Sequence, residues 1–294
     1  GMDLEKVPFR VTVVRKSKDI YYMLISHHHI LYDGWSNSLL INRFYEIYSA
    51  LINDKEITVS KQTDASTYFD YLKNYSVENS NAYWKDYLKN YHAFSLTKIL
   101  PEDVENSVNI EKKLFRKEES ETIKRFCKHN GITPAALLFA VLGLCLQKSL
   151  NCTDIMIGTT VSGRNLPIRD IDQMVGLFIQ TIPLRFQNYT EKSFLNFVRQ
   201  VNIDIINSSG NEIYSTADIK RYLGVSAEKE LFEVIAVAEN YPIDTRKLSS
   251  QEDFQIQYHM SYDKKSAAPL CVEFRIFKEI EVYFKYQKNK GASG

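Results

Sequence analysis

The stretch 26–36, which reads SHHHILYDGWS, constrains the fold more than any other part of the chain. Residues 21–26, which lead into the histidines, form a short aromatic and apolar run that is typical of a buried strand. Gly34 can adopt a positive φ, so we expect the chain to turn sharply there and to enter a helix near Trp35. The sequence therefore predicts that the histidines lie at the end of a strand and that Asp33 folds back under the imidazoles.

The adjacent residues His28 and His29 are the candidate catalytic groups of this stretch. Neighbouring residues on a strand point to opposite faces, so we expect only one of the two to face a small site, and we do not expect both to bind one metal ion. An isolated histidine at a strand end is more often structural than catalytic. The Asp33-Gly34 pair that follows makes a functional role the favoured interpretation.

Composition indicates a globular protein and gives no support to several function classes. The 294 residues are 44% hydrophobic, which is enough for a packed core and for two modest domains or two lobes of one enzyme. Lys and Arg number 37 against 36 Asp and Glu, so the net charge of +1 indicates neither nucleic acid nor an anionic membrane as a partner. The longest apolar run, 135–146, is too short to cross a bilayer.

The four cysteines form no C-x-x-C pair and no regular framework, which indicates reduced thiols and a cytoplasmic location. Cys145 lies inside an apolar helical run, where we expect it to pack as a small hydrophobic residue. That helix, 135–150, is apolar on nearly every face, which predicts that it is buried on all sides.

Hydrophobic periodicity predicts an α/β fold, with a boundary between two lobes near residue 105. The first lobe is 1–105, the second is 106–290, and 291–294 resembles a linker or tag remnant. Predicted helices cover 35–53, 67–74, 81–90, 120–130, 135–150, 191–206 and 217–223. Predicted strands cover 9–14 and 20–26, which form a hairpin, then 108–115, 231–238, 255–262, 270–277 and 281–286. The stretch 154–165 predicts a further buried strand that runs into a glycine-containing loop.

Two glycine-containing segments, 154–165 and 173–185, are the other motifs of the chain. Each taken alone predicts only a core strand and a turn. Neither has the lysine and Ser/Thr of a Walker motif, and no G-x-G-x-x-G occurs, so nucleotide binding has no support. No serine or cysteine occupies a nucleophile elbow, so an acyl-enzyme route has no candidate residue.

Together these motifs resemble the condensation domains of nonribosomal peptide synthetases, which are chloramphenicol acetyltransferase-like acyltransferases. The resemblance rests on four segments in the family's order. Residues 28–34 match His-His-x-x-x-Asp-Gly, 158–164 match Gly-Thr-x-x-Ser-Gly-Arg, 176–181 match Gly-Leu-Phe-x-Asn-Thr, and 239–242 read ENYP as in the family. Gln180 departs from the pattern, because the family usually has asparagine there, which puts in doubt any hydrogen bond that needs the shorter amide.

The resemblance runs from about Pro8 to Tyr286 and implies a two-lobed fold of mixed sheets flanked by helices, with an incomplete N-terminal lobe. It implies a peptide bond formed between a donor aminoacyl or peptidyl thioester and an acceptor aminoacyl thioester. Both would be carried on phosphopantetheine arms of peptidyl carrier proteins, with no cofactor bound by the domain itself and an adenylation domain adjoining it. Residues 26–31 and 239–242 further resemble the subtype that accepts an L-configured donor.

The resemblance also implies a role for each candidate residue. His29 would hydrogen-bond the acceptor amine, either as general base or as an orienting group, while His28 would stabilise the loop and His27 would be structural. Asp33 would pair with Arg164 and clamp the lobes, which is an architectural role. The remaining candidates, with no metal site among them, are Gly34 in the motif and Trp35, Ser162, Gly176, Phe178 and Gln180 along a substrate channel; for Trp35, helix packing is an equal alternative.

Three function classes stay open at this point. The first is the condensation domain. The second is another acyltransferase of the superfamily, acting on a coenzyme A ester or an alcohol, or an epimerisation domain. The third is a non-catalytic scaffold or carrier-docking fragment. Trp35, Ser36 and the Ser-Gly-Arg stretch at 162–164 favour the first.

Overall fold

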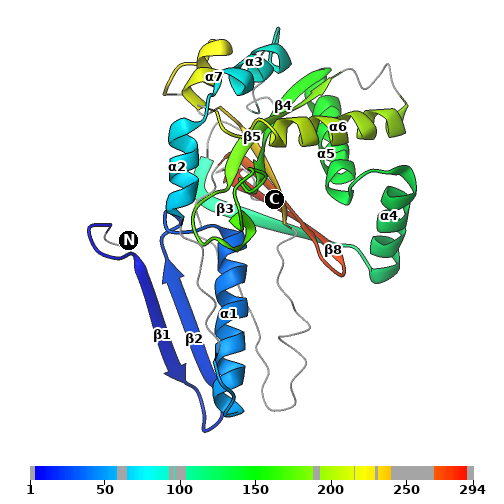
Figure 1. The fold of residues 1–294 in the computed structure, drawn as a ribbon. Helices are drawn as coiled ribbons and strands as arrows, with labels where there is room; N and C mark the ends of the chain where they lie inside the picture. Colours follow the sequence, from blue (N-terminus) through cyan, green and yellow to red (C-terminus); the bar gives the residue numbers. More distant parts are fainter. Residues whose placement is uncertain are drawn as a thin grey trace. The chain divides into compact units, whose positions relative to one another are not determined.

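The computed structural model describes residues 4–57, 65–92, 96, 104–187, 193–214, 216–228, 231–239 and 268–289, and these form two compact units (Figure 1). Of the described residues, unit 1 holds those in 4–75 and 166–179, and unit 2 holds the rest. The division differs from the predicted boundary near residue 105. It falls between Tyr75 and Ser76, because the helix that follows packs its Trp84 into a core cluster of unit 2.

Unit 1 is built on an antiparallel hairpin of β1 (Phe9–Arg15) and β2 (Tyr21–His27), as the alternation predicted. Its helices are α1 (Gly34–Ile52) and α2 (Ser66–Asn74), and a short 3-10 helix, η2, covers Ile171–Gln173. A small core joins one residue of α2 to the 166–179 segment and consists of Tyr68, Ile171, Met174 and Phe178.

The predicted burial of β2 is wrong, although the strand itself is present. Tyr22 is 50% exposed and Leu24 is 53% exposed. The hairpin is a two-stranded sheet with no third strand among the described residues. An apolar sequence run predicts a strand, but whether the strand is covered depends on what packs against it.

Unit 2 contains a six-stranded mixed sheet with the strand order β3-β8-β7-β6-β4-β5. The strands are β3 (Val104–Leu114), β4 (Asp154–Val161), β5 (Gln180–Gln187), β6 (Val234–Glu239), β7 (Leu270–Ile276) and β8 (Ile280–Asn289). The β4–β6 and β6–β7 pairs are parallel and the other pairs are antiparallel, which confirms the predicted mixed sheet. The predicted strand 255–262 lies outside the described residues.

Helices cover both faces of this sheet. The helices of unit 2 are α3 (Glu78–Tyr87), α4 (Lys117–Asn130), α5 (Pro134–Leu150), α6 (Phe194–Ser209) and α7 (Thr216–Tyr222). Side chains alternate along a strand, so Ile155 and Ile157 of β4 pack in the large core with α4, α5 and α6. Met156 between them packs on the other face, in a second cluster with Trp84 of α3 and Ile219 of α7.

The central helix α5 has the predicted start, because the Thr133 side chain accepts a hydrogen bond from Ala136 N and Pro134 occupies the first turn. The prediction that α5 is buried on all sides is wrong. Val141 is 41% exposed, and Cys145, one turn further on, is also exposed rather than packed. Residues four apart share one helix face, so one narrow stripe of α5 faces away from the core.

Gly143 of α5 lies close against the sheet. A Cβ atom at this position would lie 2.5 Å from the ring of Phe186 on β5. We therefore expect Gly143→Ala to lower the melting temperature, because overpacking costs about 1–3 kcal/mol and outweighs the gain of about 1 kcal/mol in helix propensity.

The matched control is Gly210→Ala at the end of α6, where the nearest atom to a new Cβ is a backbone oxygen at 3.4 Å. Thermal unfolding followed by circular dichroism compares the two variants. A Gly143→Ala protein that melts at or above the Gly210→Ala protein would show that the helix and sheet can separate at little cost.

The described helices also bear on the membrane and redox predictions. No single helix among them is long and apolar enough to cross a membrane. Among the described helices, only α4 and α5 taken together reach the length and apolar composition of a membrane span, and the chain bends by 101° between them. Much of α5 is buried in the core of unit 2. The four cysteines all lie in the described part of the chain, and none of them forms a disulfide there.

Candidate active site

The loop that leads from β2 into α1 is closed by Asp33, not by Gly34. Asp33 has an extended backbone (φ −96°, ψ −179°), and its Oδ1 accepts a hydrogen bond from Ser36 N at 2.8 Å, so it is the N-cap of α1. Gly34 is the first residue of the helix, and the expected positive φ is absent there; among the described residues, the glycines with positive φ are Gly131, Gly163 and Gly224. An extended capping residue makes the turn without a left-handed glycine.

The other carboxylate oxygen of Asp33 connects this loop to the segment before β5. Oδ2 accepts from Phe178 N at 3.0 Å and from Ile179 N at 3.3 Å, and Asp33 N donates to Gly176 O at 3.2 Å. The side chain is buried, with 3% of the residue exposed. Three backbone N–H groups thus converge on one carboxylate, so Asp33 has an architectural role within unit 1.

Ser36 and Trp35 add two further links between the same segments. Ser36 Oγ donates to Gly176 O at 2.9 Å and accepts from Gly176 N at 3.1 Å, while Trp35 Nε1 donates to Asp172 O at 2.8 Å. In the sequence, Ser36 is recognisable only as part of the motif, and no sequence pattern predicts its hydrogen bonds to Gly176, 140 residues away. Trp35 binds a neighbouring backbone, and both of its predicted roles, channel lining and helix packing, stay predictions.

Phe178 lies in the interior of unit 1 and Gly176 is half-buried beside it, while their predicted place along a substrate channel stays a prediction. Phe178 is 2% exposed, and its ring meets the ring of Tyr68 edge-on at a centroid distance of 4.7 Å. A Cβ on Gly176 would lie 2.8 Å from the Phe178 ring, so the position has no room for a side chain unless that ring shifts.

The two histidines of the motif lie beyond the end of β2, which stops at His27. His28 and His29 occupy a turn in which Leu31 N donates to His28 O at 3.1 Å. The expectation that strand alternation separates their side chains therefore does not apply. Both residues are exposed, and no group of three potential metal ligands is present among the described residues.

The hydrogen bonds of this turn assign different tautomers to the two rings. His29 Nδ1 lies 2.9 Å from Tyr32 O, and a carbonyl oxygen only accepts, so Nδ1 carries the proton and Nε2 of the neutral ring has the lone pair. His28 Nδ1 accepts from Ile30 N at 3.2 Å, so the neutral ring of His28 carries its proton on Nε2. Of the two, His29 is the one whose outer nitrogen can accept a proton.

His27 stacks on Tyr32, with ring centroids 4.0 Å apart and 17° between the planes. Burial, and then the neighbouring charges of His29 and His28, lower the pKa of His27 from its ordinary value of 6.5. A histidine with a lowered pKa binds fewer protons in the folded state than in the unfolded state at pH values just below its ordinary pKa of 6.5. The neutral ring of His27 is therefore the form that supports folding.

We expect the stability difference between the wild-type protein and a His27→Phe variant to fall as the pH drops below about 6.5. Phenylalanine keeps the stack on Tyr32 and has no proton to gain, so the variant lacks this source of acid sensitivity. Denaturant unfolding at several pH values between about 7.5 and 5.5 measures it. A difference that stays constant over this range would show that His27 has the same pKa in both states.

The Ser162-Gly163-Arg164 segment belongs to unit 2 and follows β4. Arg164 is 7% exposed, and its backbone N donates to Ser162 Oγ at 3.3 Å. Gln180 begins β5 and pairs with Val161. Because Asp33 and Arg164 belong to different units, their ion pair stays a prediction.

Glu239, the first residue of the ENYP motif, ends β6 and belongs to a charged cluster on the sheet of unit 2. Its Oε2 lies 3.4 Å from Arg275 Nε, and Lys285 Nζ lies 2.8 Å from Glu273 Oε2 in the same cluster. The rest of the motif, 240–242, lies outside the described residues.

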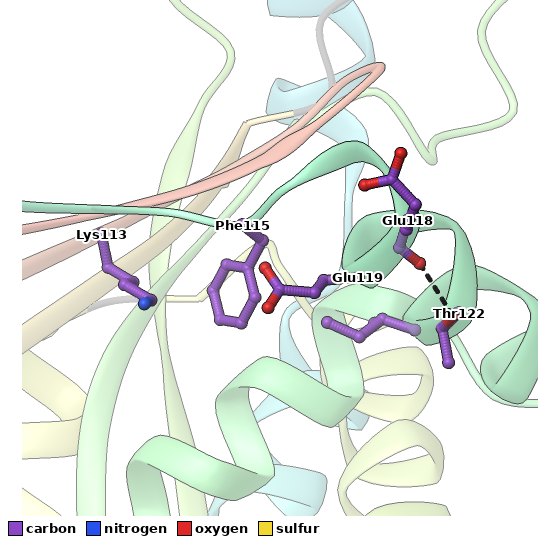
Figure 2. Close-up of a pocket in the computed structure, with 6 residues that line it drawn as sticks. Lys113, Phe115, Glu118, Glu119 and Thr122 are labelled. Carbon is purple, nitrogen blue, oxygen red and sulfur yellow. Dashed lines mark hydrogen bonds between the residues drawn. The ribbon is translucent and has the colours of Figure 1, made fainter.

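A pocket of about 490 Å³ lies at the start of α4 in unit 2 (Figure 2). Its lining residues are Lys113, Phe115, Glu118, Glu119, Thr122 and Ile123. Thr122 Oγ1 donates to Glu118 O at 2.7 Å, which is an ordinary contact of a first helical turn (Figure 2). None of the predicted site residues lines this pocket.

Comparison with known proteins assigns the family. Residues 1–290 match the family model described as condensation domain. The chain is 30% identical over 246 residues to gramicidin S synthase 2 of Brevibacillus brevis, covering 82% of this chain and 6% of that protein. It is 29% identical over 255 residues to bacitracin synthase 1 of Bacillus licheniformis, covering 85% of this chain and 5% of that protein. The chain thus spans only a small part of the length of these relatives.

Solved structures agree on the fold. The first condensation domain of the calcium-dependent antibiotic synthetase, solved with a substrate analogue, has a TM-score of 0.73 at 18% identity over 97% of this chain and 65% of that chain. The epimerization domain from the third module of tyrocidine synthetase B has a TM-score of 0.72 at 18% identity over 97% of this chain and 68% of that chain. The chain belongs to the condensation domain family of nonribosomal peptide synthetases.

Proposed function

We propose that this chain forms a peptide bond between a donor aminoacyl or peptidyl thioester and the amine of an acceptor aminoacyl thioester. Membership of the condensation domain family supports this reaction class. The observation that carries it is the tautomer of His29, whose Nδ1 donates to Tyr32 O and whose Nε2 is left as an acceptor on an exposed side chain.

The chemistry requires a neutral amine that attacks the thioester carbonyl. A free α-amine has a pKa of about 7.7–8.0 and a histidine about 6.5, so a histidine can accept or share the amine proton near neutral pH without being a strong base. His29 Nε2 supplies that acceptor, and the Nδ1–H bond to the Tyr32 carbonyl fixes the ring that carries it. The role is either general base or orienting group.

The remaining groups of the loop position His29 and do not react. The Asp33 carboxylate is occupied by three backbone N–H groups, so we assign it an architectural role and no part in proton transfer. The sequence offers no nucleophile elbow, which favours direct attack of the amine on the donor thioester without an acyl-enzyme. The C–N bond forms, the C–S bond of the donor thioester breaks, and the thiol of the donor's phosphopantetheine arm leaves with the proton that the amine loses.

We further propose the partners that such a reaction needs. In the two named synthases the matched region is 6% and 5% of the protein, which supports carrier and adenylation domains as neighbours in the same polypeptide. Both substrates would arrive on phosphopantetheine arms of carrier proteins, in the cytoplasm. The resemblance of 26–31 and 239–242 to the corresponding subtype supports an L-configured donor.

The test is a product assay with the complete polypeptide that contains this chain and two carrier proteins, one loaded with a donor and one with an acceptor aminoacyl thioester. We expect a dipeptidyl thioester on the acceptor carrier, detected by mass spectrometry. An acceptor whose α-amine is replaced by hydrogen is the control and should give none. Acyl transfer from a coenzyme A ester or to an alcohol, exchange of the donor α-proton with solvent, or no turnover would each assign the chain to another function class.

A further inference from the structure

Glu212 is a buried carboxyl group that none of the motifs above uses. The residue is 2% exposed, and neither carboxylate oxygen makes a hydrogen bond within the described part of the chain. Burying a charged group without a partner is costly. The charge of this carboxyl and its contacts therefore depend on the groups that face it.

The backbone on both sides of Glu212 is held in place by aromatic residues. Trp84 Nε1 on α3 donates to Asn211 O at 2.9 Å, and the Tyr214 hydroxyl donates to Thr181 O on β5. Both rings pack in the cluster that covers the β4–β5 end of the sheet. A segment anchored at both ends has little freedom to carry Glu212 away from its neighbours.

The carboxyl faces the loop that contains the Ser-Gly-Arg motif. The backbone N–H groups of Gly163 and Asn165 are directed at it and favour its charged form, although neither reaches normal hydrogen-bond geometry. Gly163 has a left-handed backbone, with φ of +66°, which is one of the two backbone conformations that alternate in a concave anion site made of N–H groups. The N–H group of Arg164, between the two, is engaged by Ser162 Oγ.

Burial raises the pKa of Glu212 from 4.5 to about 7, and the N–H groups of Gly163 and Asn165 oppose that rise. The charged side chain of the facing loop is that of Arg164. Of the neighbouring groups, Trp84 and Thr181 do not titrate, and burial raises the pKa of Tyr214 so far that the phenol stays neutral. Of the groups named here, the Glu212 carboxyl is the one whose pKa burial brings close to neutral pH.

We propose that Glu212 is a positioning residue, whose charged carboxylate draws the N–H groups of Gly163 and Asn165 toward it and thereby holds the backbone of Arg164. When the carboxyl is protonated, this hold on the loop is weaker. The consequence for catalysis rests on the proposed function, because it requires that the Ser162–Asn165 loop matters for peptide bond formation. The contact between Glu212 and this loop does not depend on the proposed function.

The first test is independent of activity and needs only the wild-type protein and one variant. We expect the amide proton shifts of Gly163 and Asn165 to titrate with a midpoint near pH 7 by NMR, and to lose that titration in Glu212→Gln. Gly224 is the matched control, since it also has a positive φ but its N–H donates to Arg221 O at 3.2 Å. Flat shifts at Gly163 and Asn165 in the wild-type protein would overturn the proposal.

The second test compares rates of peptide bond formation in the complete polypeptide. We expect the ratio of the wild-type rate to the Glu212→Gln rate to be close to one near pH 6 and to rise to about tenfold above pH 8, the size of a weak hydrogen bond to a charged group. Glu121→Gln, an exposed glutamate of α4, is the control and should give a ratio that does not vary with pH.

The two readouts separate the two proposals. A ratio that is the same at every pH would overturn the positioning role of Glu212 even where peptide is formed. If neither protein forms peptide, the proposed function fails, and the amide titration alone then decides whether the carboxylate holds the loop.

Discussion

His29→Ala is expected to slow peptide bond formation by about 10²–10⁴-fold, which is the range that general-base catalysis contributes. The reason is the tautomer of the ring. Its Nδ1–H donates to Tyr32 O, so Nε2 is the nitrogen that can take up the proton of the acceptor amine. The measurement is the single-turnover rate with both carrier proteins loaded. His27→Phe, which keeps the stack on Tyr32, is the control and should leave the rate within about threefold, well below the general-base range.

A second substitution at the same position separates the two possible roles of His29. In His29→Asn the side-chain amide can still donate to Tyr32 O and hold the turn, but it has no basic nitrogen. If His29 removes the proton, His29→Asn should be as slow as His29→Ala, and both losses should shrink at higher pH, where more of the acceptor amine is already neutral. If His29 orients the amine, the loss should not vary with pH.

One result would contradict a catalytic role of His29. A His29→Ala protein whose rate lies within about twofold of the wild-type rate would be below the smallest effect of a general base. The catalytic assignment would then be wrong, and a scaffold or docking role would become the favoured function.

The parts of this fold that the sequence predicted are those that depend on neighbouring residues. Alternation predicted the β1–β2 hairpin, and Thr133-Pro134 predicted the start of α5. Gly131 predicted the end of α4, where the structure has a left-handed residue with φ of +65°. Each of these signals lies within a few residues of the structure it forms, so no knowledge of the tertiary fold was needed.

The wrong predictions depended on contacts between distant parts of the chain. Gly34 was expected to make the turn, but Asp33 makes it as the N-cap of α1, and its other carboxylate oxygen is held by N–H groups of Phe178 and Ile179, about 145 residues away. Cys145 was expected to be packed, but its exposure depends on which stripe of α5 the sheet and α6 leave uncovered. Periodicity gives the face of a helix and not the partner that covers it.

The partners of Asp33 also make its removal the largest change in stability that we expect. Asp33→Ala deletes the N-cap of α1, at about 0.5–2 kcal/mol, and leaves the N–H groups of Phe178 and Ile179 without an acceptor, at about 1–3 kcal/mol for a buried group. We expect a total loss of about 3–5 kcal/mol in the free energy of unfolding, measured with denaturant.

The matched control is Ser193→Ala, which removes the N-cap of α6, where the side chain accepts from Asn196 N and, among the described residues, from no distant segment. It should cost about 1 kcal/mol. Equal losses at the two positions would mean that the bonds to Phe178 and Ile179 contribute nothing.

A double-mutant cycle of Asp33→Ala with Arg164→Gln tests the predicted ion pair. A coupling of at least about 0.5 kcal/mol, the smallest seen between residues in contact, would place Arg164 beside Asp33. Additive losses would leave the carboxylate with its backbone partners alone.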